Sequence, residues 1–478
     1  MLDIDQTGID FINKLRNKEN KYKLSTTIPE LLIDVKFGLK ENGNFELSFD
    51  LLPEHKSKGV NSDYFFTHPC LLLAPGQKIL LQNTDIIGTT INFSPTSFQM
   101  NAEFKAFRGD IDDSLWKKSK QSAFIPYDRK IFSPYRLGVK FDLSTNKERG
   151  DRGFYNVIKL NVGNIDLIFY YEEVDKDYGY YIIRTNGLVD YLVFRNIIES
   201  IMIAFGLLSG FYMADSIYFM SVKSSNKNDV TYRYENLRQV INSNSPIIST
   251  GHYQDIPESK LLLTSEQFNE FVRLLVKNED YKRSVLLLIN AGNEKGCAKA
   301  TLGAVALETI TSVIGKNISN KTIVDNKQTV RAIKYKLIKV LSEFKNEVSD
   351  SQYSILKNKI NLINSIPNTV KYIDAFQIVG IELDEEELYC LKCRNMFLHG
   401  TLPKREQETM LSDDELLDVV SNRLVMLSAM LLLKKSGYTG YVIDKGMTDV
   451  IKFRMLRNGS KVQSGYCLRE IVKSVDVE

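Results

Sequence analysis

The stretch that decides the fold assignment is residues 385–400, EEELYCLKCRNMFLHG. Asp384 just before it is a good helix N-cap, and three glutamates follow where the helix dipole favours negative charge. Gly400 is a natural residue for the position just beyond a helix end. The stretch therefore predicts a helix from about residue 385 to about residue 399.

Helical spacing divides this predicted helix into two faces. One face is wholly apolar and predicts packing into a core; it holds Tyr389, Cys390, Cys393, Met396 and Phe397. The other face alternates leucines with polar groups; it holds Leu388, Leu391, Lys392, Arg394, Asn395, Leu398 and His399. Leucines that exclude water around polar groups are typical of a subunit interface that also contains a polar site. A simpler interpretation is that Arg394 and Lys392 reach solvent and His399 only caps the helix.

Helical spacing dominates the chain from residue 261 onward and predicts an α-helical bundle. The last long segment, residues 412–437, has the sequence SDDELLDVVSNRLVMLSAMLLLKKSG. Ser412 and Glu415 are spaced as a capping box, and Gly437 is a helix stop signal. Its ends are therefore predicted as firmly as those of residues 385–399.

The first half of the chain has a different pattern. From about residue 44 to 185, short segments such as NFELSFDLL and NIDLIFYYE alternate apolar and polar residues, which predicts strands. A long apolar segment from Leu188 to Tyr212 predicts a helix packed on those strands, and SIYFMSV returns to strand. The sequence between Ser224 and Lys260 is rich in Asn, Ser and Pro, as connectors are.

These patterns predict an α+β protein with two main domains. The predicted division is a β-rich N-terminal domain at 1–224, a connector at 225–260, an α-helical domain at 261–440 and a C-terminal extension at 441–478. A chain of 478 residues is long enough for two or three domains. The N-terminal domain is expected to have a sensing or regulatory role.

Composition narrows the class only slightly. The chain is 43% hydrophobic and 25% charged with a net charge of +3, which is ordinary for a soluble protein. The first residues lack the features of a secretory signal, and five cysteines fit reduced thiols better than a disulfide framework. We therefore expect a cytoplasmic protein that does not bind a membrane.

Two other features invite a chemical interpretation. Cys390 and Cys393 form a C-x-x-C, but nothing completes a zinc site and both lie on the apolar face, so we expect buried thiols. Glu308 lies in an otherwise apolar helix, where it either supports an active-site cation or belongs to a solvent-facing stripe. The stripe is the simpler interpretation, and Glu308 is not assigned a catalytic role.

The sequence Arg394-Asn395, followed by three residues and His399, resembles the R-x4-6-H motif of HEPN-domain ribonucleases. In that family the motif lies on a late helix of a helical bundle, as it does here within residues 261–440. A β-rich region before a HEPN-like bundle further resembles ApeA-like abortive-infection proteins. One departure is that the tyrosine following the histidine in nucleotidyltransferase-paired HEPN proteins is missing, since Gly400 and Thr401 come next. Regulation by that route is not expected.

The resemblance implies a metal-independent endoribonuclease with Arg394, Asn395 and His399 as catalytic residues and with no metal or cofactor. RNA carries its own nucleophile, the 2′-hydroxyl, so such an enzyme needs a base, an acid and a group that holds the phosphate. One histidine serves poorly for both proton transfers, whereas a homodimer or higher oligomer brings two copies of Arg394 and His399 into one cleft. The implied products are a 2′,3′-cyclic phosphate and a 5′-hydroxyl.

The resemblance also implies a role in anti-phage defence by abortive infection, with RNA as substrate and a phage-derived trigger at the N-terminal domain. Two alternatives stay open on the sequence. The helical domain is then a catalytically silent HEPN module that binds RNA or a protein partner, or the β-rich domain binds a ligand and the helices only dimerise it.

Overall fold

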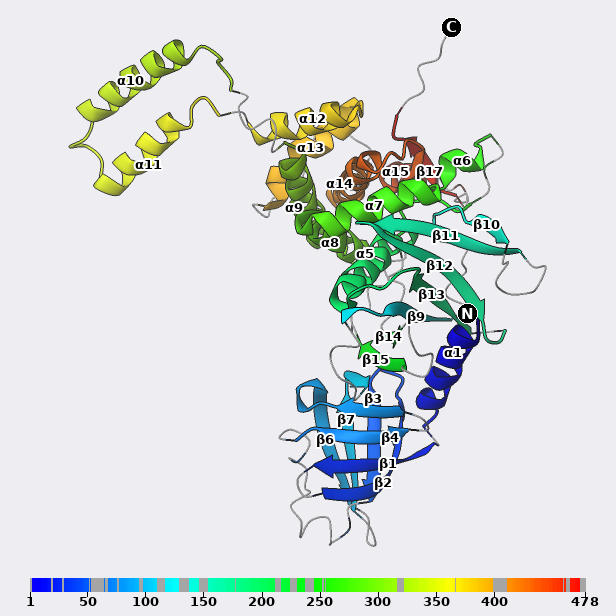
Figure 1. Ribbon diagram of the computed structural model, residues 1–478. Coiled ribbons are helices and arrows are strands. Elements are labelled where there is room, and N and C mark those ends of the chain that lie inside the picture. The colour runs from blue at the N-terminus through cyan, green and yellow to red at the C-terminus, as the bar shows by residue number, and fades with distance from the viewer. Residues whose placement is uncertain are drawn as a thin grey trace. The chain divides into compact units, whose positions relative to one another are not determined.

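The computed structural model describes residues 2–18, 20–27, 30–50, 52, 64, 68–74, 77–93, 98–109, 117–128, 137–145, 154–176, 178–210, 216–223, 230–236, 245–251, 253, 255–315, 322–365, 367–398, 411–458, 460 and 465–472. The chain divides into two compact units. We call Met1–Asn293 with Ser436–Ile443 the sheet unit, and Glu294–Lys435 with Asp444–Glu478 the helical unit. The prediction of a β-rich N-terminal part followed by a helical part is confirmed (Figure 1).

The sheet unit is built on one sheet of 15 strands that pair antiparallel. The order across the sheet is β10-β11-β12-β13-β9-β14-β15-β8-β5-β4-β1-β2-β3-β7-β6. The strands are β1 (Lys21–Thr27), β2 (Glu30–Leu39), β3 (Phe45–Asp50), β4 (Cys70–Ala74), β5 (Gln77–Leu81), β6 (Ile86–Phe93), β7 (Phe98–Phe104), β8 (Ala106–Gly109), β9 (Lys120–Asp128), β10 (Asp142–Thr145), β11 (Phe154–Val162), β12 (Ile165–Glu173), β13 (Tyr178–Thr185), β14 (Ser216–Val222) and β15 (Val230–Asn236).

Strand β3 shows how a period-two segment forms a strand with one buried face. In β3, Phe45, Leu47 and Phe49 are buried while the residues between them are not. Each segment predicted as a strand from residue 44 to 185, and SIYFMSV after them, overlaps a strand of the sheet. The structure adds elements before residue 44 that the pattern did not predict, namely strands β1 and β2 and helix α1 (Leu2–Arg16).

Helix α5 (Tyr191–Ser209) is the buried helix predicted between Leu188 and Tyr212. The Asp190 side chain caps its first turn by accepting from the Leu192 N–H at 2.8 Å. It ends at Gly210, whose φ of 74° suits glycine and whose Cβ position would lie 2.5 Å from the Pro246 nitrogen. Both ends of this apolar helix are therefore set by local sequence.

Helices α7 (Ser265–Lys277) and α8 (Glu279–Asn293) belong to the sheet unit. Phe205 of α5 lies between Phe169 of β12, at 5.0 Å, and Phe268 of α7, at 4.3 Å between ring centroids. The Lys282 ammonium of α8 pairs with the Glu199 carboxylate of α5 at 2.7 Å. The short helix α6 (Glu258–Leu261) precedes α7, and η1 (Asn83–Asp85) is a single 3-10 turn.

The boundary between units consequently differs from the predicted one. It lies after Asn293 instead of near residue 260, because two amphipathic helices pack on α5 and β11. The predicted connector 225–260 contains β15 and most of α6. The predicted extension 441–478 contributes helix α15 (Lys445–Arg457) to the helical unit, where it packs on α14. Helical periodicity identified α7 and α8 but not the surface on which each one packs, and it did not identify α15.

The helical unit contains α9 (Gly296–Gly315), α10 (Lys327–Glu343), α11 (Asp350–Asn361), α12 (Asn368–Val379), α13 (Glu385–Leu398), α14 (Asp413–Lys435), α15 and β17 (Cys467–Glu470). Strand β16 (Tyr441–Asp444) lies where the chain passes between units. In α14, the Ser412 hydroxyl accepts from the Glu415 N–H at 3.3 Å, and the Glu415 carboxylate accepts from the Ser412 N–H at 2.8 Å. The predicted capping box is confirmed, and Gly437 has a φ of 85°. Helix α12 was not predicted.

Three helices, α5, α9 and α14, are long and apolar enough to cross a membrane by length and composition. Most of the apolar window in α5 and α14, and half of that in α9, is buried within the protein. The cytoplasmic location stays a prediction.

Candidate functional site

Helix α13 carries the predicted site and begins with a reciprocal cap. The Asp384 carboxylate accepts from the Glu387 N–H at 2.8 Å, and the Glu387 carboxylate accepts from the Asp384 N–H at 3.0 Å. The predicted start at residue 385 is confirmed, and the described part of the helix runs to Leu398; the predicted limit at residue 399 lies outside the described residues. Within the helical unit it packs on α9, α12 and α14.

The buried face of α13 differs from the predicted apolar face. Cys390, Cys393 and Phe397 are buried as expected. Leu391 and Arg394, which the sequence placed on the mixed face, are also buried, with only 1% and 3% of their surface exposed. The expectation that Leu391 faces a second subunit is therefore wrong, and so is the interpretation that Arg394 reaches solvent.

Arg394 is a cation fixed by three helices. Its guanidinium forms an ion pair with the Glu308 carboxylate of α9, and its guanidinium carbon lies 5.2 Å from the ring centroid of Tyr372 on α12. Burial lowers the pKa of Arg394 from its ordinary value, yet an arginine stays protonated in proteins. The stacking ring and the carboxylate together hold the plane of the guanidinium in place.

Glu308 combines the two interpretations that the sequence allowed. Its side chain is 49% exposed, so it belongs to a solvent-facing stripe of α9, and it also supports a buried cation. One edge of the guanidinium therefore meets a half-exposed carboxylate.

The other two predicted catalytic residues are only partly covered by the structure. Asn395 follows Arg394 within α13, but its side chain is not described. His399 and Gly400 lie outside the described residues. The prediction that Arg394, Asn395 and His399 act together is therefore untested, and its structural content rests on Arg394.

A second buried ion pair fixes the start of α13 and was not predicted. Glu387 is 1% exposed, and its carboxylate accepts from Arg469 Nε at 2.8 Å and Nη2 at 3.2 Å. Arg469 Nη2 also donates to the Glu382 carbonyl at 2.6 Å. A residue of β17, near the end of the chain, thus holds the first turn of the helix that carries Arg394.

The cysteines of α13 behave as packing residues. Cys390 and Cys393 are buried free thiols, as predicted, and burial raises the pKa of the Cys390 thiol well above its usual range. Across the part of the chain that the structure describes, no group of three or more His, Cys, Asp or Glu residues is placed to hold a metal ion.

A pair of lysines forms another polar cluster in the helical unit. Burial lowers the pKa of Lys445 on α15 to about 8, and the positive charge of Lys299 on α9 contributes to the shift. Burial also lowers the pKa of Lys299, whereas the nearby Asp449 carboxylate favours both charges. Asp449 accepts from the Asn422 amide of α14 at 2.7 Å. The cluster links three helices that pack on one another.

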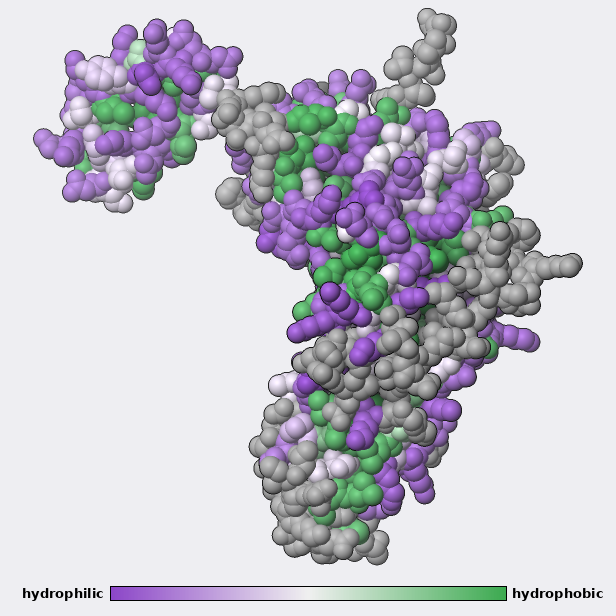
Figure 2. All heavy atoms as spheres, in the orientation of Figure 1, coloured by the Kyte–Doolittle hydropathy of each residue, from purple (hydrophilic) through white to green (hydrophobic). Residues whose placement is uncertain are grey.

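Helices α10 and α11 form a hairpin without a single buried side chain. Its base is tied by Asn364, whose amide donates to the Val324 carbonyl at 3.0 Å and accepts from the Val324 N–H at 2.8 Å. Helix α10 carries one carboxylate, Glu343, against five cations, which are Lys327, Arg331, Lys334, Lys336 and Lys339. Figure 2 shows hydrophilic side chains over most of this hairpin.

The centre of the cationic face of α10 is an aromatic ring. Tyr335 is 72% exposed and lies one helical turn from Arg331 and one turn from Lys339. A separate stripe of the same helix leaves Ile333, Val340 and Phe344 partly exposed, on the side roughly opposite Tyr335. Proteins that bind single-stranded nucleic acid commonly present exposed aromatic rings between cations. The bases stack on the rings, and the phosphates pair with the cations.

Comparison with protein-family models, with curated proteins and with solved structures finds no match for this chain.

Proposed function

We propose that this protein is a metal-independent endoribonuclease of the HEPN class that acts in anti-phage defence by abortive infection. The observation that carries the proposal is the state of Arg394. It is a buried, stacked and ion-paired cation on a late helix of the helical unit, and Asn395 and His399 follow it in the R-x4-6-H spacing. Burying an arginine is costly, and the half-exposed Glu308 carboxylate compensates that cost only in part, which favours a use of the charge beyond packing.

The proposed reaction uses the 2′-hydroxyl of RNA as nucleophile. A histidine base removes its proton, the 2′-oxygen forms a bond to phosphorus, and the bond from phosphorus to the 5′-oxygen breaks. A histidine acid protonates that leaving oxygen, which gives a 2′,3′-cyclic phosphate and a 5′-hydroxyl. His399 from each of two copies supplies the base and the acid, and Arg394 holds the phosphate as its charge rises.

Glu308 has a defined part in this proposal. In the absence of RNA its carboxylate occupies the anion position on Arg394 and keeps the guanidinium oriented. Because Glu308 is half exposed, it leaves to solvent at little cost when a phosphate arrives. The RNA phosphate then replaces the Glu308 carboxylate as the anion that pairs with Arg394.

The cationic face of α10 is the proposed RNA-binding surface. Its charge excess attracts phosphates, and Tyr335 offers a ring for one base. Reversing two charges, as in Arg331→Glu with Lys339→Glu, is expected to weaken binding of single-stranded RNA by about tenfold or more. Tyr335→Ala is expected to weaken it by about fivefold or more, from the lost stacking.

Binding is measured by fluorescence anisotropy on the His399→Ala protein, so that the RNA stays intact. The matched control is Lys357→Glu with Lys359→Glu on α11, which makes the same change in net charge. Circular dichroism should be unchanged in every case, because none of these side chains is buried. An equal effect of the α10 and α11 changes would show that net charge alone attracts RNA and that α10 is no binding surface.

The experiment that tests the proposed function follows RNA cleavage by the purified protein in excess EDTA. Cleavage is expected to continue and to leave 2′,3′-cyclic phosphate ends, whereas His399→Ala should be inactive. Expression of both proteins in bacteria, with growth and RNA integrity followed together, covers the case of a trigger present only in cells. A strict need for Mg²⁺, or 3′-hydroxyl products, would refute the mechanism.

A catalytically silent HEPN module is the main alternative. It predicts that the wild type binds RNA or a protein partner through the helical unit and never cleaves RNA under any trigger. The remaining alternative, a ligand-binding sheet unit with helices that only dimerise, has its own structural support in a pocket of that unit.

A further inference from the structure

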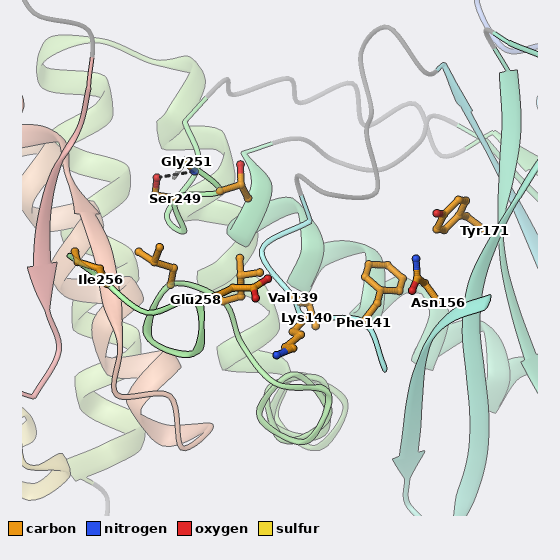
Figure 3. A pocket seen from close by; sticks show the side chains of 12 residues that line it. Val139, Lys140, Phe141, Asn156, Tyr171, Ser249, Gly251, Ile256 and Glu258 are labelled. Atoms are coloured by element: carbon orange, nitrogen blue, oxygen red, sulfur yellow. Dashed lines mark hydrogen bonds between the residues drawn. The ribbon is translucent and has the colours of Figure 1, made fainter. Parts of the chain in front are cut away.

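The sheet unit contains a pocket of about 450 Å³ (Figure 3), a size typical of small-molecule sites. One wall comes from β11, β12 and the residues before β10, and the other from residues 249–251 and 256–262. It is lined by Val139, Lys140, Phe141, Asn156, Tyr171, Ser249, Thr250, Gly251, Ile256, Glu258, Leu261 and Leu262. All of these residues belong to the sheet unit.

Hydrogen bonds hold the two walls together. The Lys140 N–H donates to the Leu263 carbonyl at 2.8 Å, and the Leu263 N–H donates to the Gly138 carbonyl at 3.0 Å. On the other wall, the Ser249 hydroxyl donates to the Tyr253 hydroxyl at 3.1 Å and accepts from the Gly251 N–H at 3.3 Å. The pocket is therefore formed before any ligand binds, which limits the entropic cost of binding.

Two aromatic rings form a corner in the pocket. The rings of Phe141 and Tyr171 are perpendicular, with centroids 6.2 Å apart. Phe141 also lies 6.0 Å from Phe169, which is fully buried in the sheet unit. Anchored on one side and open on the other, Phe141 presents a fixed apolar surface to a planar ring.

Three polar side chains that line the pocket are available to a ligand. Lys140, Asn156 and Glu258 make no side-chain hydrogen bond or ion pair with any residue that the structure describes. Figure 3 shows Asn156 beside Phe141, and Lys140 between these two residues and Glu258. An amide, a cation and a carboxylate are thus available next to the aromatic corner.

We propose that this pocket binds a mononucleotide. The base packs against Phe141 and Tyr171, and the Asn156 amide, with a donor beside an acceptor, pairs with the base edge. The Lys140 ammonium binds the phosphate, and the Glu258 carboxylate accepts from a sugar hydroxyl. The proposal concerns the sheet unit alone and stands whether or not the helical unit cleaves RNA.

The test is isothermal titration of the full-length protein with AMP, GMP, CMP and UMP, each beside its nucleoside and beside inorganic phosphate. At least one mononucleotide is expected to bind with a Kd in the micromolar range. The corresponding nucleoside and inorganic phosphate should each bind with an affinity lower by about tenfold or more, because each lacks one half of the contacts.

Variants then locate the site. Asn156→Asp and Lys140→Ala are each expected to weaken the mononucleotide by about tenfold, and Lys140→Ala should leave nucleoside binding unchanged. Lys159→Ala is the matched control for Lys140→Ala. Lys159 is an exposed cation on β11, the strand that carries Asn156, and it does not line the pocket. Thermal melting of each variant excludes unfolding as the cause.

Two results would overturn the proposal. One is the absence of binding by all four mononucleotides at millimolar concentration. The other is a mononucleotide affinity that is the same in Asn156→Asp, in Lys140→Ala and in the control Lys159→Ala. Neither result bears on the nuclease, whose test reads cleavage of RNA by the helical unit.

Discussion

Arg394→Ala is expected to lower the rate of RNA cleavage by about a thousandfold or more, because it removes the cation that meets the phosphate in the transition state. The fold should survive. The partner left behind, Glu308, is half exposed and can be hydrated, so the loss of unfolding free energy should be about 1–2 kcal/mol. The measurement is a single-turnover cleavage rate, with thermal melting of the same samples.

Two further variants separate charge from packing at this position. Arg394→Lys keeps the charge but loses the planar fork and the stacking on Tyr372, so cleavage should stay strongly reduced. Glu308→Gln replaces the competing anion with a neutral amide whose oxygen can still accept from Arg394 and keep it oriented, so cleavage should persist and the KM for RNA should fall. An Arg394→Ala protein that cleaves RNA at the wild-type rate would remove Arg394 from the mechanism.

Glu387→Ala is expected to have the largest effect on stability, a loss of about 3–5 kcal/mol in the unfolding free energy of the helical unit. The change leaves the largely buried Arg469 guanidinium without its carboxylate and also removes half of the reciprocal cap at the start of α13. Urea unfolding of the full chain measures the loss, with the transitions of the two units fitted separately.

The control for this prediction is Glu385→Ala, two residues earlier in the same first turn. Glu385 is exposed and has no hydrogen bond or ion pair from its side chain to any described residue, so the change should cost no more than about 0.5 kcal/mol. Adding Arg469→Ala to Glu387→Ala should recover part of the loss, since the unpaired buried charge is then gone. A Glu387→Ala protein as stable as Glu385→Ala would contradict the assigned role of the pair.

The sequence by itself determined the features that depend on near neighbours. The starts of α13 and α14 follow from caps within four residues, and the strands from residue 44 to 185 follow from alternation along one segment. The position of Arg394 near the end of a late helix was predicted in the same way. Helix α12 was not predicted as a separate helix, and only Tyr372, Ala375 and Phe376 are buried in it.

Tertiary structure alone decided which charges are buried. Hydropathy treats Arg394 and Glu387 as solvent-facing residues, yet both are buried because partners 86 and 82 residues away, Glu308 and Arg469, neutralise them. The same limit applies to the packing of α7 and α8 on the sheet unit. A periodic pattern records that a face must be covered and that a charge needs a partner, but the partner is chosen by long-range packing, which no local pattern contains.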